Sequence, residues 1–199
     1  MTSSYQSVSG SGNKGVQELA EQIEKLHGQE EDLGSPDPDA LPRGEVFGRT
    51  IAFNVVPRAE RFAPDGSGFT TEELKMGNEV RKVLGIPDLV CSATAVRVPV
   101  VAGHAVSIYG RFESPVSPNE AREVLSRAAG LRVVDDPARD QYPTPLHAAG
   151  LDDVLVGRVR QPEGDDRALL LFAVGDNLRK GAALNMVQIA ELLLAGSGS

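Results

Sequence analysis

Strand-like runs that follow one another directly are the feature that most limits the fold of this chain. Two such runs, Leu89–Val101 and His104–Phe112, are separated by only two residues, and Val154–Arg160 is followed closely by Arg167–Val174. Short connections suit hairpins or sharply turned antiparallel pairs, because parallel neighbours need a long crossover. The order predicts an α+β fold with a mixed, largely antiparallel sheet and helices on one face.

Helices are predicted from apolar spacing and from end signals. Apolar residues recur at helical spacing over Val16–Leu26, with Glu18, Glu21 and Glu24 on other faces. A second helix begins at Thr71 and stops at Gly85, and the capping box at residues 117–120 begins a third. The remaining expected elements are strands at Ile51–Val56 and Leu131–Val134, and a long final helix at Leu178–Leu194.

The length of 199 residues suits one domain with a proper core, and we expect a single domain over 1–199. Residues 5–15 are rich in glycine and serine and are typical of a loop. Three prolines and a run of acids predict a mobile connector over 28–44, and residues 195–199 are expected to form a flexible tail.

Charge and cysteine content exclude several classes of function. Twenty Lys and Arg against 28 Asp and Glu give a net charge of −8, which disfavours nucleic acid and anionic membranes as partners. The single cysteine, Cys91, has no partner for an intramolecular disulfide, and no Cys/His cluster has the spacing of a metal site. The longest apolar run, Ala168–Val174, is far shorter than the ~20 residues that span a bilayer. We therefore expect a soluble, cytoplasmic protein without a metal.

Common catalytic and nucleotide-binding motifs are absent from the sequence. There is no phosphate-binding Walker loop, no GxSxG elbow and no HExxH pair, and the Gly-rich stretch Ser9–Gly12 precedes a predicted helix without a predicted strand before it. The candidates that remain are Arg97, in SATAVRVPVV, and His104, seven residues later in VAGHAVSI. Each of these residue types, taken alone, is more often structural than catalytic.

Seven segments, in order and over nearly the whole chain, carry a resemblance to a known family. They are SYQSVSGSGNKGVQEL at 4–19, AFNVVP at 52–57, TTEELKMGNEVRKVLG at 70–85, SATAVRVPVVAGH at 92–104, DQYPTPLHAAG at 140–150, VGRVR at 156–160 and DNLRKGAALNMVQIAELL at 176–193. Together they resemble the C-terminal half of aspartate-semialdehyde dehydrogenase. That family reduces aspartyl phosphate with NADPH through a thioester on a catalytic cysteine.

The resemblance implies a role for five residues of a substrate pocket. His104 matches the family's acid/base histidine and Arg97 its substrate-carboxylate arginine. Gln6 matches the glutamine that orients the reacting substrate, and Glu72 with Lys75 matches the pair that holds the amino and phosphate ends of the substrate. The residue types suit these roles, since a guanidinium binds a carboxylate in a fork and imidazole titrates near neutral pH.

The resemblance also indicates what the family has and this sequence does not. The family's N-terminal Rossmann domain and its Asn-Cys nucleophile motif have no counterpart, and Cys91 does not replace the nucleophile by motif. We therefore expect no cofactor for the isolated chain, and NADP only if a partner supplies the Rossmann domain. Asn177 resembles the residue beside the nicotinamide. Ala105 stands where the family commonly has serine after its histidine, and Ala95 where it has cysteine.

Three functions remain open from the sequence, because fold alone does not fix function. The first is a repurposed non-redox acid/base enzyme, of isomerase, cyclase, lyase or hydrolase type, on a small carboxylate-bearing substrate. The second is a non-catalytic dimerisation or regulatory partner of a full-length dehydrogenase, and the third is one half of a split dehydrogenase. A homodimer is expected because the family dimerises through this half, and a heteromer with a full-length or split dehydrogenase is the alternative.

Overall fold

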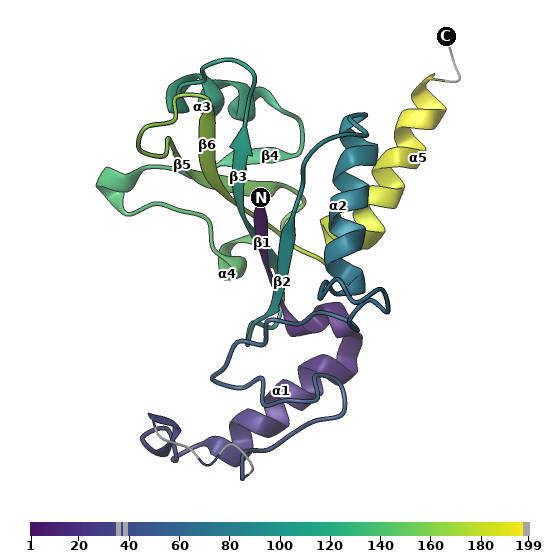
Figure 1. Cartoon of the computed structure of the whole chain (residues 1–199), viewed down its shortest axis with the longest axis vertical. Coiled ribbons are helices and arrows are strands. Elements are labelled where there is room, and N and C mark those ends of the chain that lie inside the picture. The colour runs from purple at the N-terminus through teal and green to yellow at the C-terminus, as the bar shows by residue number, and fades with distance from the viewer. Residues whose placement is uncertain (35–36, 38–39, 197–199) are drawn as a thin grey trace.

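A computed structural model describes residues 1–34, 37 and 40–196. Six strands form one sheet in the order β2-β1-β3-β6-β5-β4 (Figure 1). The pairs β1/β3, β3/β6 and β5/β6 are antiparallel, whereas β1/β2 and β4/β5 are parallel, so the predicted mixed, largely antiparallel sheet is confirmed. The strands are β1 (Thr2–Gln6), β2 (Ala93–Arg97), β3 (His104–Arg111), β4 (Leu131–Val133), β5 (Val154–Arg160) and β6 (Ala168–Gly175).

The first strand separates two strands that the sequence predicts as neighbours. β1 lies between β2 and β3, and Tyr5 pairs with Val96 on one side and with Ala105 on the other. The expected direct pairing of the runs on either side of Gly103 is therefore wrong. Polar residues such as Ser4 obscured β1 in the sequence. Pairing on both sides satisfies the backbone groups of this strand without an apolar pattern.

The end signals of the helices are confirmed. Both capping boxes are present, at the starts of α2 and α3, and Gly85 ends α2 in the left-handed conformation with a φ of 67°. The final helix differs from the prediction, because a π-helical turn at Arg179–Ala183 precedes its α-helical part. The helices are α1 (Gly12–Leu26), α2 (Thr71–Leu84), α3 (Pro118–Arg127), α4 (Pro145–Ala148) and α5 (Leu184–Gly196).

A buried carboxylate fixes the chain that follows α1. Figure 1 shows α1 extending away from the sheet at the end where β1 finishes. Glu18 is only 8% exposed, and its carboxylate accepts hydrogen bonds from the backbone N–H groups of Val46 (2.7 Å) and Phe47 (3.2 Å). Glu18, which the sequence places on a face other than the apolar one, is therefore buried as well. A buried charge is tolerated when it is hydrogen-bonded in this way.

Gln22, one turn further along α1, replaces the pairing that a strand at Ile51–Val56 would have made. Its Oε1 accepts hydrogen bonds from the N–H groups of Ile51 (2.7 Å) and Ala52 (3.1 Å). The segment consequently runs as turns against the helix, and Val56 alone forms an isolated bridge with Arg97. The predicted strand is wrong because a side chain, and not a neighbouring strand, satisfies its backbone.

The predicted connector and tail lie partly outside the described residues. Within 28–44, a short 3-10 turn spans Asp32–Gly34, and Leu33 and Leu41 pack against the buried cluster that contains Leu26. Residues 35–36 and 38–39 of that segment lie outside the description. In the predicted tail, residues 195 and 196 belong to α5, and 197–199 lie outside the description. The mobility of both segments stays a prediction.

Glu73 joins α2 to the edge strand of the sheet, and its removal tests this link. Its carboxylate accepts from Thr70 N–H (2.7 Å) in the capping box and from Ala95 N–H (2.9 Å) on β2. We expect Glu73→Ala to lower the free energy of unfolding by about 2 kcal/mol, because two part-buried donors lose their acceptor. Glu120→Ala, in the exposed capping box of α3, should cost only about 0.5–1 kcal/mol. Urea denaturation measures the free energy of unfolding of both variants. Equal decreases would contradict the proposed link between α2 and β2 through Glu73.

Candidate functional site

Three of the predicted site residues meet at one end of the sheet because of strand direction. β1 and β2 are parallel and end together, with Gln6 paired to Arg97. β3 runs antiparallel to β1, so its first residue, His104, lies at the same end. Tyr5 pairs with Ala105, which places Gln6 opposite His104 on one face of the sheet. The topology therefore assembles a glutamine, an arginine and a histidine from residues that lie far apart in the sequence.

The imidazole of His104 is held by Ser7, a residue that the sequence analysis did not identify. The backbone N–H of Ser7 donates to Nδ1 of His104 (3.2 Å), and the Ser7 hydroxyl lies 3.0 Å from the same nitrogen. An N–H group only donates, so Nδ1 acts as the acceptor and carries no proton. The neutral ring therefore has its hydrogen on Nε2.

The surroundings of His104 favour this neutral form. Burial is the largest cause and the positive charge of Arg97 the second; together, opposed by Glu72, they lower the pKa of His104 to about 4. The ring is consequently uncharged at neutral pH and presents Nε2–H as a donor. A neutral imidazole of this kind can polarise a carbonyl oxygen by hydrogen bonding without carrying a full charge.

Arg97 is available to bind an anion. Its Nη1 donates to the carbonyl oxygen of Ser7 (3.3 Å), and no described carboxylate lies within ion-pair distance of it. Burial lowers the pKa of Arg97, while the negative charges of Glu72 and Glu60 oppose that shift. The guanidinium nevertheless stays protonated at any ordinary pH. A charged and partly desolvated group with no counter-ion suits a carboxylate ligand.

Gly10 allows the arginine and the histidine to approach each other. A Cβ atom at Gly10 would lie 2.9 Å from Nη1 of Arg97 and 3.0 Å from Nε2 of His104. The two nitrogens are therefore at most about 6 Å apart, on either side of a residue without a side chain. A carboxylate on Arg97 and a carbonyl oxygen near His104 can thus belong to one small molecule.

Gln6, Glu72 and Lys75 form a chain of hydrogen bonds beside this pair. The amide of Gln6 donates to Oε1 of Glu72 (3.1 Å), and Lys75 Nζ donates to Oε2 of Glu72 (3.1 Å). Glu72, in the first turn of α2, has only 15% of its side chain exposed. Its hydrogen bond and its charge raise the pKa of Lys75, which stays protonated. The structure thus places all five pocket residues implied by the family resemblance within one connected region.

Asn177 stabilises the site through hydrogen bonds to the segments on either side of it. Its Oδ1 accepts from Gly103 N–H (2.9 Å) and from the Ser7 hydroxyl (3.1 Å), and its Nδ2 donates to Ser9 Oγ (3.0 Å). Each polar atom of its amide therefore has a partner within the chain. Asn177 holds the segment that positions the imidazole of His104.

The alanine after the histidine does not affect the imidazole directly. Ala105 faces the opposite side of the sheet, where it packs with Ala148, Leu155 and Val174. A serine at this position would point into that cluster and away from His104. In this chain Ser7 makes the side-chain contact to the ring.

Ser7, Ser9 and Gly10 escaped the sequence analysis because a Gly/Ser-rich segment is typical of a loop. Their role can be recognised only once β1 is known, because this strand places the segment that follows it next to Arg97 and His104.

Among the described residues, no group of three or more His, Cys, Asp or Glu side chains is arranged to hold a metal ion. Nor does any helix in the described ranges have the length and apolar character needed to cross a membrane.

The lowered pKa of His104 should make the free energy of unfolding depend on pH. The unfolded chain takes up a proton near pH 6.5, whereas the folded chain does so only near pH 4. The contribution of His104 to stability is therefore complete above about pH 6.5 and is lost as the pH falls towards 4. We expect the difference in unfolding free energy between wild type and His104→Gln to rise with pH across this window. Urea denaturation at several pH values measures it, and parallel curves would contradict the shift.

Known proteins share both the sequence and the fold. Residues 1–180 match the family model described as "Semialdehyde dehydrogenase, dimerisation domain". Aspartate-semialdehyde dehydrogenase from Mycolicibacterium smegmatis is 52% identical over 98% of this chain and 56% of its own length. The enzyme from Corynebacterium glutamicum is 47% identical over 96% of this chain and 55% of its own length.

The solved structure of aspartate semialdehyde dehydrogenase II from Vibrio cholerae superposes with a TM-score of 0.84 at 37% identity. It covers 98% of this chain, which in turn covers 54% of that structure. The chain therefore spans about half the length of the relatives it matches. Taken with the sheet order and the site above, these matches show that the chain belongs to the semialdehyde dehydrogenase dimerisation-domain family.

Proposed function

We propose that this chain supplies the substrate-binding and dimer-forming half of an aspartate-semialdehyde dehydrogenase, and that the nucleotide-binding half lies outside these 199 residues. One observation carries the proposal: Arg97 has no carboxylate partner among the described residues, and it lies beside the Nε2–H of a neutral His104. The high identity to dehydrogenases that are nearly twice as long supports it.

The residues divide the work of binding a small amino-acid-like substrate. Arg97 binds its carboxylate through two parallel N–H···O bonds. His104 donates from Nε2 to the carbonyl oxygen at the reacting carbon, while Glu72 binds an ammonium group and Lys75 an anionic group at the other end. Gln6, fixed by its bond to Glu72, orients the substrate. In the acid/base role that the family resemblance implies, His104 therefore starts as a neutral imidazole with its hydrogen on Nε2.

We expect the isolated chain to bind no NADP, because it matches a dimerisation-domain model over residues 1–180. The family resemblance places Asn177 beside the nicotinamide; its Nδ2 donates one of its two hydrogens to Ser9, which leaves the other for a cofactor. NADP would enter only with a nucleotide-binding half.

The exposed apolar side chains of α5 support the proposal that another domain or chain packs against this helix. α5 carries apolar side chains on all sides, and Met186, Ile189 and Leu192 are 67%, 50% and 73% exposed. A helix that is apolar all round is normally buried. In the proposed assembly the nucleotide-binding half covers α5.

A second chain is proposed to cover one face of the sheet. Tyr5 of β1 and Phe172 of β6 lie on the same face with ring centroids 6.0 Å apart, and Tyr5 is 36% exposed although its strand is paired on both sides. An aromatic side chain left half open over internal strands is typical of an interface. The dimerisation-domain family supports a homodimer.

A charge placed on this face should separate the protomers. We expect Tyr5→Arg to convert the dimer to a monomer, because two copies would bring arginines together in a desolvated interface. Val124→Arg, on the exposed side of α3, is the matched control and should leave the dimer intact. Light scattering after size-exclusion chromatography gives the mass; a dimer that survives Tyr5→Arg at micromolar concentration excludes this face.

Native mass spectrometry of the protein recovered from its own cells, followed by a dehydrogenase assay, tests the proposal. We expect a complex with a nucleotide-binding polypeptide that oxidises aspartate semialdehyde with NADP and phosphate. Arg97→Lys should lower kcat/KM about a hundredfold, since the bidentate contact is lost. A homodimer that has no such partner and stays inactive in that assay would contradict the proposal.

The non-redox acid/base enzyme is the second candidate, favoured by the presence of Arg97 and His104 in one chain. It predicts that the lone homodimer converts a small carboxylate substrate and loses that activity in His104→Gln. A non-catalytic regulatory partner predicts instead that Arg97→Lys leaves the activity of a recovered dehydrogenase complex unchanged.

A further inference from the structure

We propose that the Ser7 hydroxyl, together with the side-chain oxygen of Asn177, accepts the hydrogen of Nδ1 when His104 takes up a proton. Ser7 is then a positioning residue, because it acts through His104 and does not touch the substrate. This role rests on the proposed function only for the identity of the group that exchanges a proton with Nε2. The family resemblance implies roles for five pocket residues, and Ser7 is not one of them.

Hydrogen on Nδ1 decides what His104 can do at Nε2. A neutral ring with its hydrogen on Nε2 can donate a hydrogen bond, but losing that hydrogen as a proton would leave an imidazolate anion. A ring with hydrogen on both nitrogens can release the Nε2 proton, become neutral, and later take a proton back at Nε2. The proton at Nδ1 comes from solvent, and the one from Nε2 goes to a substrate oxygen. Acid/base chemistry at Nε2 therefore needs an acceptor beside Nδ1.

The Ser7 hydroxyl is that acceptor in the described part of the chain. Nδ1 of His104 is hydrogen-bonded to two groups there, the Ser7 N–H at 3.2 Å and the Ser7 hydroxyl at 3.0 Å. The N–H can only donate, whereas the hydroxyl oxygen both donates and accepts. Ser7 has no exposed surface, so water does not reach Nδ1 from this side. Hydrogen on Nδ1 consequently points at Ser7 Oγ.

Asn177 provides a second acceptor, for the hydrogen of the Ser7 hydroxyl. The Gly103 N–H donates to its Oδ1 (2.9 Å), which identifies this atom as the oxygen of the amide. Oδ1 also lies 3.1 Å from Ser7 Oγ, and two oxygens this close need a hydrogen between them, which Ser7 must supply. The one hydroxyl hydrogen is thus required at Nδ1 and at Oδ1. A proton on Nδ1 meets both needs, because Nδ1–H then donates to Ser7 and Ser7 donates to Asn177.

The backbone around Ser7 is fixed before any proton arrives. The N–H groups of Val8 and Ser9 donate to the carbonyl oxygens of Val100 (2.9 Å) and Val101 (3.2 Å). The Asn177 Nδ2 donates to Ser9 Oγ (3.0 Å), which holds the amide in its orientation. Rotation of one hydroxyl is therefore enough to change Ser7 from donor to acceptor at Nδ1.

Other features of the site oppose the proton and keep the ring neutral at rest. Burial is the largest cause of the low pKa of His104, about 4, and the charge of Arg97 is the second, while the charge of Glu72 raises this pKa. The Ser7 N–H also opposes protonation, because it would face an N–H in place of a lone pair. The hydroxyl of Ser7 is the neutral group at Nδ1 that can favour the protonated ring.

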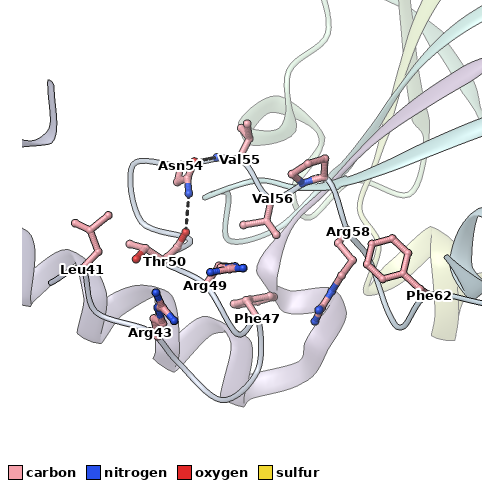
Figure 2. A pocket seen from close by; sticks show the side chains of 11 residues that line it. Leu41, Arg43, Phe47, Arg49, Thr50, Asn54, Val55, Val56, Arg58 and Phe62 are labelled. Carbon is pink, nitrogen blue, oxygen red and sulfur yellow. Dashed lines mark hydrogen bonds between the residues drawn. The ribbon is translucent and has the colours of Figure 1, made fainter. Parts of the chain in front are cut away.

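Further charged groups of this region lie around other parts of the structure. Figure 2 shows Arg43, Arg49 and Arg58 around a cavity of about 470 Å³ beside α1, and neither Ser7 nor His104 lines that cavity. Lys75 is bonded to Glu72 and lies beyond it from the imidazole. A change at Ser7 therefore alters the hydrogen bonding of the ring and leaves its charged surroundings in place.

Ser7→Ala tests the role of the hydroxyl, because it removes Oγ and keeps the backbone N–H. If the hydroxyl accepts from Nδ1–H, its loss should lower the pKa of His104 by about one unit, since a hydrogen bond to a charged group is worth more than one to a neutral group. If the hydroxyl only donates to the neutral ring, the same change raises the pKa of His104 and the proposal is overturned.

NMR of the ¹⁵N-labelled imidazole, titrated from neutral pH to the onset of acid unfolding, measures this pKa. The comparison is repeated in an Arg97→Gln background, where loss of one cause of the low pKa moves the titration to higher pH. Ser9→Ala is the matched control, because it removes a neighbouring hydroxyl that bonds Ser7 and Asn177 but not the ring. It should leave the pKa of His104 unchanged. An unaltered urea midpoint at neutral pH shows that each variant is folded.

Results of the titration do not depend on dehydrogenase activity, because no substrate, NADP or partner chain is present. A lower pKa in Ser7→Ala but not in Ser9→Ala supports the role of Ser7 even if the recovered protein has no such activity. In an active complex, Ser7→Ala should lower kcat about tenfold and leave KM for aspartate semialdehyde unchanged. An active complex in which Ser7→Ala leaves the pKa unchanged, or in which Ser9→Ala shifts it equally, keeps the proposed function and overturns the role of Ser7.

Discussion

The pairing of β1 on both of its sides is the constraint on which the site depends. This strand lies parallel to β2 and antiparallel to β3, so its carboxyl end meets the end of β2 and the start of β3. Without it, Arg97 and His104 would belong to separate strands with no common neighbour. The segment that follows β1 then supplies Ser7 to the histidine and Gly10 to the space between histidine and arginine. A polar strand of five residues thus organises the chemistry of the pocket.

The protonation states of His104 and Arg97 follow from their burial and from the lack of a counter-ion for Arg97. His104 is kept neutral by burial and by Arg97, and the N–H of Ser7 directs its hydrogen to Nε2. Arg97 remains charged and has no counter-ion among the described residues. An anionic ligand would neutralise Arg97 and thereby remove one of the two causes that keep the imidazole uncharged. Ligand binding and the protonation of His104 are therefore coupled in this site.

The sequence predicts the elements that have local signals and misses those set by distant contacts. The helix ends at Thr71, Gly85 and Ser117 follow from capping chemistry within a few residues, and the structure has them. β1 and the turns at Ile51–Val56 were not predictable in this way, because their backbone partners are strands and a glutamine far along the chain. The pocket residues were identified by resemblance to a family, whereas Ser7 and Gly10 were recognised only from the three-dimensional arrangement.

The protonation of the His104 ring tests the account most directly. Long-range ¹H–¹⁵N NMR of the imidazole, recorded at neutral pH with and without succinate, reports which nitrogen carries hydrogen. The account predicts a neutral ring with hydrogen on Nε2, whose resonances shift on addition of succinate in the wild type but not in Arg97→Gln. A ring protonated on Nδ1, or a response to succinate that does not need Arg97, would contradict it.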